Sequence, residues 1–387
     1  MRNWLNKNII ALSLVSLFDD FAYELTIAIL PAFLISINSS AATFGLIVGI
    51  ANLFSFLKII SGRLSDKLNT KKQFAVVGYV ISSINLCILP FATNWIIVFT
   101  SWIFAGIGKS IREPARNALL IESTTPKYYG RVFGFHRTID SIGAILGPAS
   151  ALFLISFLTF NYIFLISFLA SAMAVLILIL FVTQAKTDIK ISEPISLVKI
   201  RELPKQFNLF LIASGVFSLG NFANSLLIFR TIELFSSQKT AILLYTLYNI
   251  CYTLFSYPAG HLADKFGTKN ILTFGYFITA LVSVGFMFNI NLTVITILFI
   301  LSGIAAAITN SMSKSLTANL IDGKNHGTGF GLHATISGFA FMIANFIVGF
   351  LWSKFSPMYG FGYSAVFCLL GTILLFSLVK NPTLDNF

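Results

Sequence analysis

The chain of 387 residues is 56% hydrophobic and only 10% charged, and its mean hydropathy is +0.86. A soluble domain carries about 25% charged residues, so this composition excludes an ordinary soluble protein and indicates an integral membrane protein. The formal net charge of +12 does not indicate nucleic-acid binding. Lys and Arg gather instead in alternate loops, as they do in membrane proteins.

Apolar runs follow one another along the whole chain and are long enough to cross a bilayer. A helix of about 20 residues spans a hydrocarbon core of about 30 Å and pairs its own backbone groups there. The sequence therefore predicts an all-α integral membrane protein with about twelve transmembrane helices. We expect them at residues 9–35, 43–63, 73–92, 95–120, 131–158, 161–183, 208–232, 241–261, 270–289, 292–318, 328–353 and 362–380.

One long polar connection divides the predicted helices into two sets of six. We expect an N-terminal six-helix bundle at residues 1–183, a cytoplasmic linker at 184–206 and a C-terminal six-helix bundle at 207–387. Lys and Arg are frequent in the loops after the even-numbered helices and absent after the first, third, fifth and ninth. Basic loops stay on the cytoplasmic side. The pattern predicts a multi-pass protein of the cell (inner) membrane with both termini in the cytoplasm.

The two predicted halves share sequence. The segment GRLSDKLNTKK (Gly62–Lys72) matches GHLADKFGTKN (Gly260–Asn270), and GRVFGFH (Gly130–His136) matches GTGFGLH (Gly327–His333). The two matches have offsets of 198 and 197 positions. A parallel repeat of this kind predicts a binding site near the middle of the membrane, between halves that rock to give alternating access.

These features together resemble the major facilitator superfamily of secondary transporters, over the whole chain. The superfamily's signature between its second and third helices is G-x-L-x-D-[RK]-x-G-x-[RK], which Gly62, Leu64, Asp66, Lys67 and Lys71 fit. The resemblance implies that this loop governs closure at the cytoplasmic face. As a gate and topology signal, the loop needs no contact with substrate.

The signature has a second copy at Gly260, Asp264 and Lys265. Asn69 stands where the signature has its second Gly, and the second copy has Gly267 there. Asn tolerates a left-handed backbone better than other non-Gly residues. We therefore expect the loop to keep the signature's backbone turn with Asn69 in place of the second Gly.

A further segment, GAILGPASA, lies in the predicted helix 131–158. Gly143, Gly147 and Pro148 resemble the G-x-x-x-G-P core of a motif found in many proton-driven exporters of this superfamily. The closing glycine pair is replaced by Ala151 and Leu152. Small residues four apart also allow close helix contact, which is the equally supported alternative.

Charge at bilayer depth is the most informative feature of the chain. The predicted helix 95–120 carries charges on one face, at Lys109, Arg112, Glu113 and Arg116. Such charges are costly unless they face a protein interior or a water-filled cavity. Pro114 frees the carbonyl of Ser110 and predicts a bend. We place Lys109 and Arg112 at the site, and Arg116 at the cytoplasmic gate or interface.

Acids that can pair with these bases lie in the predicted helices 9–35 and 131–158. Asp20 and Glu24 share a helix face, Asp19 points about 100° away, and Arg137 and Asp140 are three apart. The second half is nearly bare of such charge, because Asn221 and Ser225 align with Asp20 and Glu24. We therefore expect substrate binding and proton coupling in the first half, at Asp20, Glu24, Lys109, Arg112, Glu113, Arg137 and Asp140.

These residues favour a proton-coupled transporter of a small organic solute, with an anion or zwitterion preferred because Lys109 and Arg112 can bind a carboxylate. The alternative is a broad-specificity proton-antiport efflux pump for amphipathic or cationic compounds, with Asp20 and Glu24 as the binding acids. An ATP-driven pump is rejected because the first Gly of a phosphate-binding loop ending at Ser110 would fall at Ile103. We expect no enzyme activity, no cofactor, no metal and no nucleic acid, and a monomer whose partners are substrate, protons and lipid.

Overall fold

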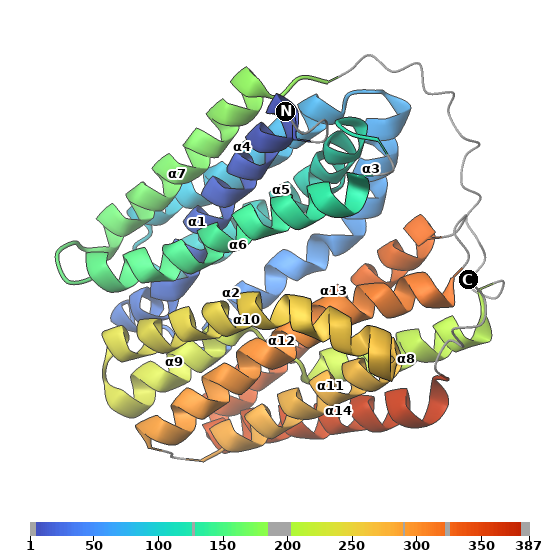
Figure 1. Ribbon diagram of the computed structural model, residues 1–387. Coiled ribbons are helices and arrows are strands. Elements are labelled where there is room, and N and C mark those ends of the chain that lie inside the picture. The colour runs from blue at the N-terminus through green and yellow to red at the C-terminus, as the bar shows by residue number, and fades with distance from the viewer. Residues whose placement is uncertain (1–4, 126–127, 185–202, 289–290, 322–325, 381–387) are drawn as a thin grey trace. The chain divides into compact units, whose positions relative to one another are not determined.

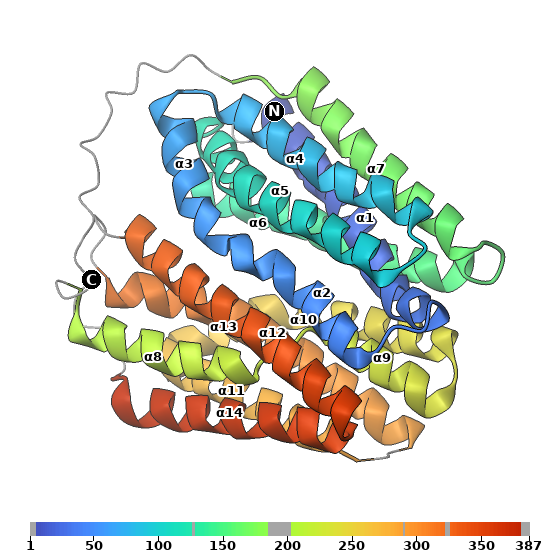
Figure 2. The same cartoon turned by 180° about the vertical axis from the view of Figure 1, so that it is seen from behind.

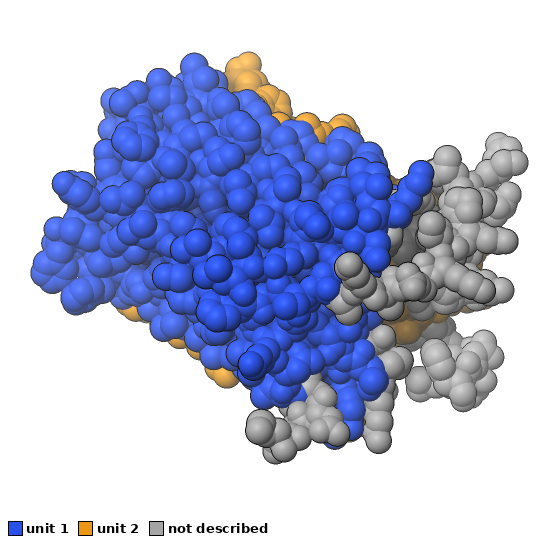
Figure 3. All heavy atoms as spheres, turned by 90° about the horizontal axis from the view of Figure 1, so that it is seen from above, with its two compact units in different colours: residues 1–38, 54–194 blue, residues 39–53, 195–387 orange. Residues whose placement is uncertain are grey.

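The structure is a computed structural model that describes residues 5–125, 128–184, 203–288, 291–321 and 326–380. The chain forms two compact units, residues 1–38 with 54–194 and residues 39–53 with 195–387, which Figure 3 colours separately. Most of the predicted linker at 184–206 lies outside the described residues.

The first unit is a helical bundle built around α1. Its helices are α1 (Lys7–Ser36), α3 (Leu57–Lys67), α4 (Lys71–Ile88), α5 (Trp95–Glu122), α6 (Tyr129–Leu154) and α7 (Phe160–Phe181). α1 packs along α6 and α7, and α4 packs along α5 and α7 (Figure 1). Asn6 and Asn94 cap α1 and α5, because each side-chain oxygen accepts hydrogen bonds from the first-turn N–H groups.

The second unit contains the later helices and one early helix. Its members are α2 (Ala41–Leu53), α8 (Lys205–Gly220), α9 (Asn224–Phe235), α10 (Gln238–Phe266), α11 (Thr268–Phe286), α12 (Leu292–Leu320), α13 (His326–Lys354) and α14 (Pro357–Leu378). α2 lies against α13 (Figure 2). Glycines allow this contact: a Cβ on Gly49 would sit 3.0 Å from the carbonyl oxygen of Met342.

The predicted helices agree with the observed ones within a few residues, and two of them are interrupted. The predicted helix 43–63 is α2 and α3 joined by a short 3-10 turn at Phe54–Phe56. The predicted helix 208–232 is α8 and α9, separated at residues 221–223. Side chains from other helices stabilise this break. Ser364 Oγ donates to the carbonyl of Gly220, and Asn345 Oδ1 accepts from Ala223 N at 2.9 Å.

Eight segments of the described chain are long and apolar enough to cross a membrane. Four long helices of the described residues lie outside that group, α1, α5, α6 and α10, with 30, 28, 26 and 29 residues. At about 1.5 Å per residue, each is longer than a hydrocarbon core of about 30 Å. Three of them, α1, α5 and α6, carry the charged residues that the sequence predicts at the site.

Equivalent contacts recur in the two units. Lys72 Nζ donates to the carbonyl of Ile179 at 2.8 Å, and Lys269 Nζ donates to the carbonyl of Phe376 at 2.8 Å. Ser13 lies 3.5 Å from His136 Nδ1, and Ser214 lies 2.9 Å from His333 Nε2. The fold is all-α, with two pseudo-repeats of six membrane-spanning segments.

Candidate functional site

Close helix contacts set the position of the charged residues in the first unit. A Cβ on Gly147 would lie 2.7 Å from Leu25 N and 2.9 Å from the Cβ of Glu24, so only Gly lets α6 approach α1 here. Gly143 makes a similar approach to the carbonyl of Leu17. Gly143 and Gly147 of the GAILGPASA segment therefore pack against α1 on either side of Asp20.

Pro114 creates a polar contact between α5 and α3. Pro has no backbone N–H, so the carbonyl of Ser110 loses its helical donor. Ser61 Oγ of α3 replaces that donor at 2.7 Å. Gly62 lies next to the same proline, because a Cβ there would be 3.4 Å from the Cβ of Pro114.

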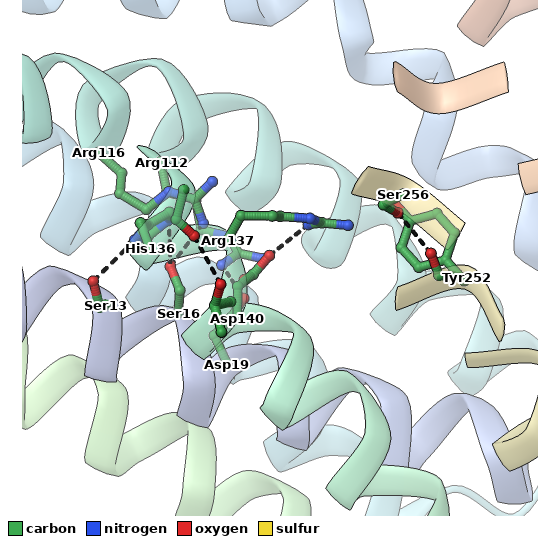
Figure 4. Close-up of polar contacts among 12 residues, drawn as sticks. Ser13, Ser16, Asp19, Arg112, Arg116, His136, Arg137, Asp140, Tyr252 and Ser256 are labelled. Atoms are coloured by element: carbon green, nitrogen blue, oxygen red, sulfur yellow. Dashed lines mark hydrogen bonds and ion pairs between the residues drawn. The ribbon is translucent and has the colours of Figure 1, made fainter. Parts of the chain in front are cut away.

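Arg112 forms an ion pair with Asp19 of α1, and the two side chains are 11% and 6% exposed (Figure 4). The Arg112 guanidinium also lies 4.6 Å from the centre of the Tyr79 ring. Sequence reasoning missed Asp19 as a site residue, because it placed Asp20 and Glu24 on the functional face. The bases on α5 could have pointed to Asp19, because each buried base needs an acid close enough to form an ion pair.

Two aspartates meet between α1 and α6. Arg137 Nη1 donates to Asp140 Oδ2 at 2.5 Å, with Asp140 buried and the Arg137 side chain 51% exposed. The Asp20 and Asp140 carboxyl groups are close enough to interact. Two carboxylates this close repel each other, and a single proton held between them would remove that repulsion. The predicted residues Asp20, Arg137 and Asp140 therefore lie together.

A second polar cluster lies further along α1, α5 and α6. Arg116 Nη1 donates to Ser16 Oγ at 3.0 Å, and Ser16 Oγ lies 3.3 Å from His136 Nε2. Figure 4 shows Ser13 and Ser16 of α1 facing His136 of α6. Sequence reasoning placed Arg116 at a gate or interface. In the structure it is half-buried and bonds to α1.

The charged stripe on α5 divides between two neighbouring helices. Arg112 and Arg116 contact α1, whereas Glu113 faces α3, where its Oε2 lies 2.6 Å from Lys58 Nζ. Lys109 is exposed, and its Nζ lies 6.0 Å from the centre of the Tyr23 ring. Among the described residues, Lys109 has no ion-pair partner. Of the three bases of the stripe, Lys109 is the exposed one, and Arg112 and Arg116 are half-buried.

The second unit has uncharged residues, Asn221 and Ser225, at the positions that align with Asp20 and Glu24. Asn221, the repeat equivalent of Asp20, lies in the break between α8 and α9. Asn224 Nδ2 donates to the Tyr248 hydroxyl at 2.6 Å. On α10, the Tyr245 and Tyr248 rings stack 5.5 Å apart. The side chains of Tyr252 and Ser256 in Figure 4 belong to the same helix.

The predicted gate residues lie at helix ends. α3 ends at Lys67, and Asn69 has φ 49°, which confirms the expected left-handed turn. Lys71 is buried in an ion pair with Glu122. In the second copy, Gly260 and Lys265 lie near the end of α10 and Gly267 has φ 87°. The side chains of Asp66 and Asp264 lie outside the described residues.

Within the described part of the chain, no group of three His, Cys, Asp or Glu side chains could hold a metal ion. The charged residues of the first unit offer instead two neighbouring carboxyl groups, several ion pairs and one exposed base.

Comparisons with known proteins agree with this architecture. The family model described as the Major Facilitator Superfamily matches residues 12–238 and 209–387. An uncharacterised MFS-type transporter of Methanocaldococcus jannaschii is 36% identical over 383 residues, covering 96% of this chain and 94% of the relative. The class H tetracycline resistance protein of Pasteurella multocida is 29% identical over 150 residues, covering 37% of this chain and 36% of that protein.

Solved structures share the fold at low sequence identity. A crystal structure of a point mutant of the nucleoside transporter NupG has a TM-score of 0.79. It is 14% identical to this chain, and the match covers 96% of this chain and 98% of that one. This similarity concerns the fold alone.

Proposed function

The chain belongs to the major facilitator superfamily, and from that premise we propose that it is a proton-coupled secondary transporter of a small organic anion or zwitterion. Transporters of this class work by alternating access to a site near the middle of the membrane. We further propose that it acts as a monomer in the cytoplasmic membrane, with both termini in the cytoplasm. The Asp20–Asp140 contact carries the proposal of proton coupling.

A shared proton makes the Asp20–Asp140 pair a suitable carrier. Two adjacent carboxyl groups in a buried site hold one proton between them, because two negative charges side by side repel each other strongly. Arg137 bonds to Asp140 and is half exposed, so its position is sensitive to rearrangement around it. Movement of Arg137 toward or away from Asp140 changes how strongly the pair holds its proton. Transport steps that move α6 would thereby bind or release that proton.

The bases of α5 support an anionic or zwitterionic substrate. Lys109 is exposed without an ion-pair partner among the described residues, and a carboxylate there would form charge-assisted hydrogen bonds. The Nε atoms of Arg112 and Arg116 are buried and make no hydrogen bond with the described chain. A buried donor of this kind is costly unless a ligand or water satisfies it. We place the charged end of the substrate beside Lys109, with Arg112 behind it.

A proton-antiport efflux pump for amphipathic or cationic compounds is the second candidate. The tetracycline resistance protein of P. multocida and the multidrug resistance protein MdtH of Aeromonas hydrophila each match about a third of the chain. Under this candidate, Asp20 and Glu24 bind the cationic group of the substrate. The motif at Gly143, Gly147 and Pro148 fits both candidates, since its glycines pack α6 against α1 in either case.

Proteoliposomes that contain the purified protein and a luminal pH dye test both candidates. A panel of carboxylates and amino acids is compared with a panel of cationic amphiphiles, and proton movement is recorded with solute flux. The proposal expects flux of an anion or zwitterion together with protons. Flux of cationic amphiphiles alone would overturn it in favour of the second candidate. An absence of proton movement during solute flux would overturn the coupling.

Two substitutions refine this test. Asp20→Asn keeps a hydrogen-bonding partner for Asp140 but cannot take up a proton, so solute exchange should persist and accumulation driven by a pH gradient should stop. Retained accumulation in this variant contradicts the coupling role.

Lys109→Gln should weaken anion uptake, whereas Lys239→Gln, in the first turn of α10, should leave it unchanged.

A further inference from the structure

A groove lies on the surface of the second unit between α11 and α14. It is shallow and open, with a volume of about 550 Å³, and its walls include Phe274, Phe277, Ile373 and Phe376. These side chains are strongly exposed, with Ile373 at 59% and Phe376 at 67%. Both helices are among the segments apolar enough to cross a membrane. The walls of the groove therefore face the acyl chains of the surrounding lipid.

One end of the groove carries a positive charge. Lys269 is the second residue of α11, and its neighbour Asn270 lines the groove. Lys269 Nζ donates to the carbonyl of Phe376 at 2.8 Å and lies 5.2 Å from the centre of the same ring. An ammonium has three donors, so this bond leaves two for another acceptor. Lys269 has no acidic partner within ion-pair distance in the described chain.

We propose that the α11–α14 groove binds one anionic phospholipid, with its phosphate at Lys269 and an acyl chain along the aromatic walls. Basic residues beside grooves between transmembrane helices attract anionic headgroups, and this is the chemistry that Lys269 supplies. The apolar walls supply the second requirement, since each CH₂ group buried there adds to binding. The site lies outside the charged cluster of the first unit and is independent of the proposed transport function.

The internal repeat provides a matched comparison. Lys72 of α4 makes the same kind of bond, to the carbonyl of Ile179 on α7. The two lysine–carbonyl bonds are 197 positions apart, and at that offset Val77 and Val80 replace the two phenylalanines of α11. Leu176 and Ile179 likewise replace Ile373 and Phe376. Lys72 thus shares the charge and backbone contact of Lys269 but lacks the aromatic walls.

Native mass spectrometry of the full chain in detergent tests the site, with phosphatidylglycerol and phosphatidylcholine of identical acyl chains as probes. Wild type should retain one phosphatidylglycerol more strongly than phosphatidylcholine. Lys269→Gln should weaken that retention roughly fivefold, the effect of one basic residue at a membrane surface. Lys72→Gln should retain the wild-type preference. Equal losses in the two lysine variants would indicate diffuse surface charge and overturn the proposal.

A second pair of measurements tests the acyl-chain half of the site. The double variant F274V F277V, which copies the first unit, should weaken retention of both lipids. Glycerol phosphate, which lacks acyl chains, should neither bind nor compete with phosphatidylglycerol. Competition by glycerol phosphate would show a site for free phosphate esters and overturn the lipid assignment. Unchanged retention of phosphatidylglycerol and phosphatidylcholine by F274V F277V would show that the aromatic walls do not hold an acyl chain, and this too would overturn the proposal.

Discussion

Ser61 Oγ on α3 donates a 2.7 Å hydrogen bond to the carbonyl of Ser110, the group that Pro114 leaves without its helical donor. A serine far away in the sequence therefore compensates for one proline. The contact joins α3, which carries the signature residue Gly62, to the charged helix α5. A movement of α3 that breaks this bond leaves a buried carbonyl unpaired.

Ser61→Ala should destabilise the protein by about 1–2 kcal/mol, because it removes the donor of a buried carbonyl. Pro114→Ala restores the backbone donor within α5. Ser61→Ala should therefore cost much less in the Pro114→Ala background, and a double-mutant cycle on unfolding in detergent measures the difference. Strictly additive effects of the two substitutions would show that Ser61 does not serve the freed carbonyl.

Asp19→Asn should cost about 3–5 kcal/mol, because it leaves the Arg112 guanidinium buried without its counter-charge. Replacing both partners with apolar residues, as in D19L R112M, should recover much of that loss. Thermal unfolding followed by circular dichroism gives both values. An equal loss of stability in Asp19→Asn and in D19L R112M would show that the unpaired charge is not the cause.

Two glycines of α6 should respond in opposite directions to the same substitution. Gly147→Ala places a Cβ 2.7 Å from Leu25 N and forces α1 and α6 apart, at a cost of about 1–3 kcal/mol. Gly134→Ala meets no atom within 4 Å and should stabilise α6 by up to about 1 kcal/mol through helix propensity. Equal melting temperatures for the two variants would contradict the close packing of α6 on α1.

Cleavage of the central linker should leave the two halves of the chain associated. α2 comes early in the sequence but packs on α13 through Gly45, Gly49 and Gly349. A protease site inserted near residue 190 allows cleavage after purification, and an affinity tag on one fragment should then retain both. Gly49→Leu should weaken this retention, because the added side chain meets the carbonyl of Met342. Separation of the wild-type fragments under mild detergent would contradict the packing of α2 on α13.

The sequence predicted the helices well because apolar length and basic loops depend on local composition. The turn at Asn69 was predictable for the same reason, since one residue type and one motif position define it. Pairings between helices were harder. A helical wheel places Asp19 about 100° from Asp20, but it does not say which neighbouring helix each residue faces. Asp19 was therefore missed as the partner of Arg112.

The two helix interruptions could not be predicted for a related reason. The break at residues 221–223 is stabilised by Asn345 and Ser364, which lie more than a hundred positions later. The short 3-10 turn at Phe54–Phe56 separates α2 from α3, and these helices pack in different units. Neither segment contains a proline, so no local residue predicts that the helix is interrupted there. Contacts with residues far away in the sequence determine both interruptions.

The placement of α2 also constrains how the protein is made. α2 ends at Leu53, whereas α13, on which it packs, begins at His326. During synthesis, α2 enters the membrane while most of the chain is still untranslated, and its glycine face must remain without its final neighbour until α13 follows. Contacts of such large sequence separation form late and slowly. The packing of α2 is therefore completed only after α13 has been made, and a chain that stops before α13 leaves the glycine face of α2 uncovered.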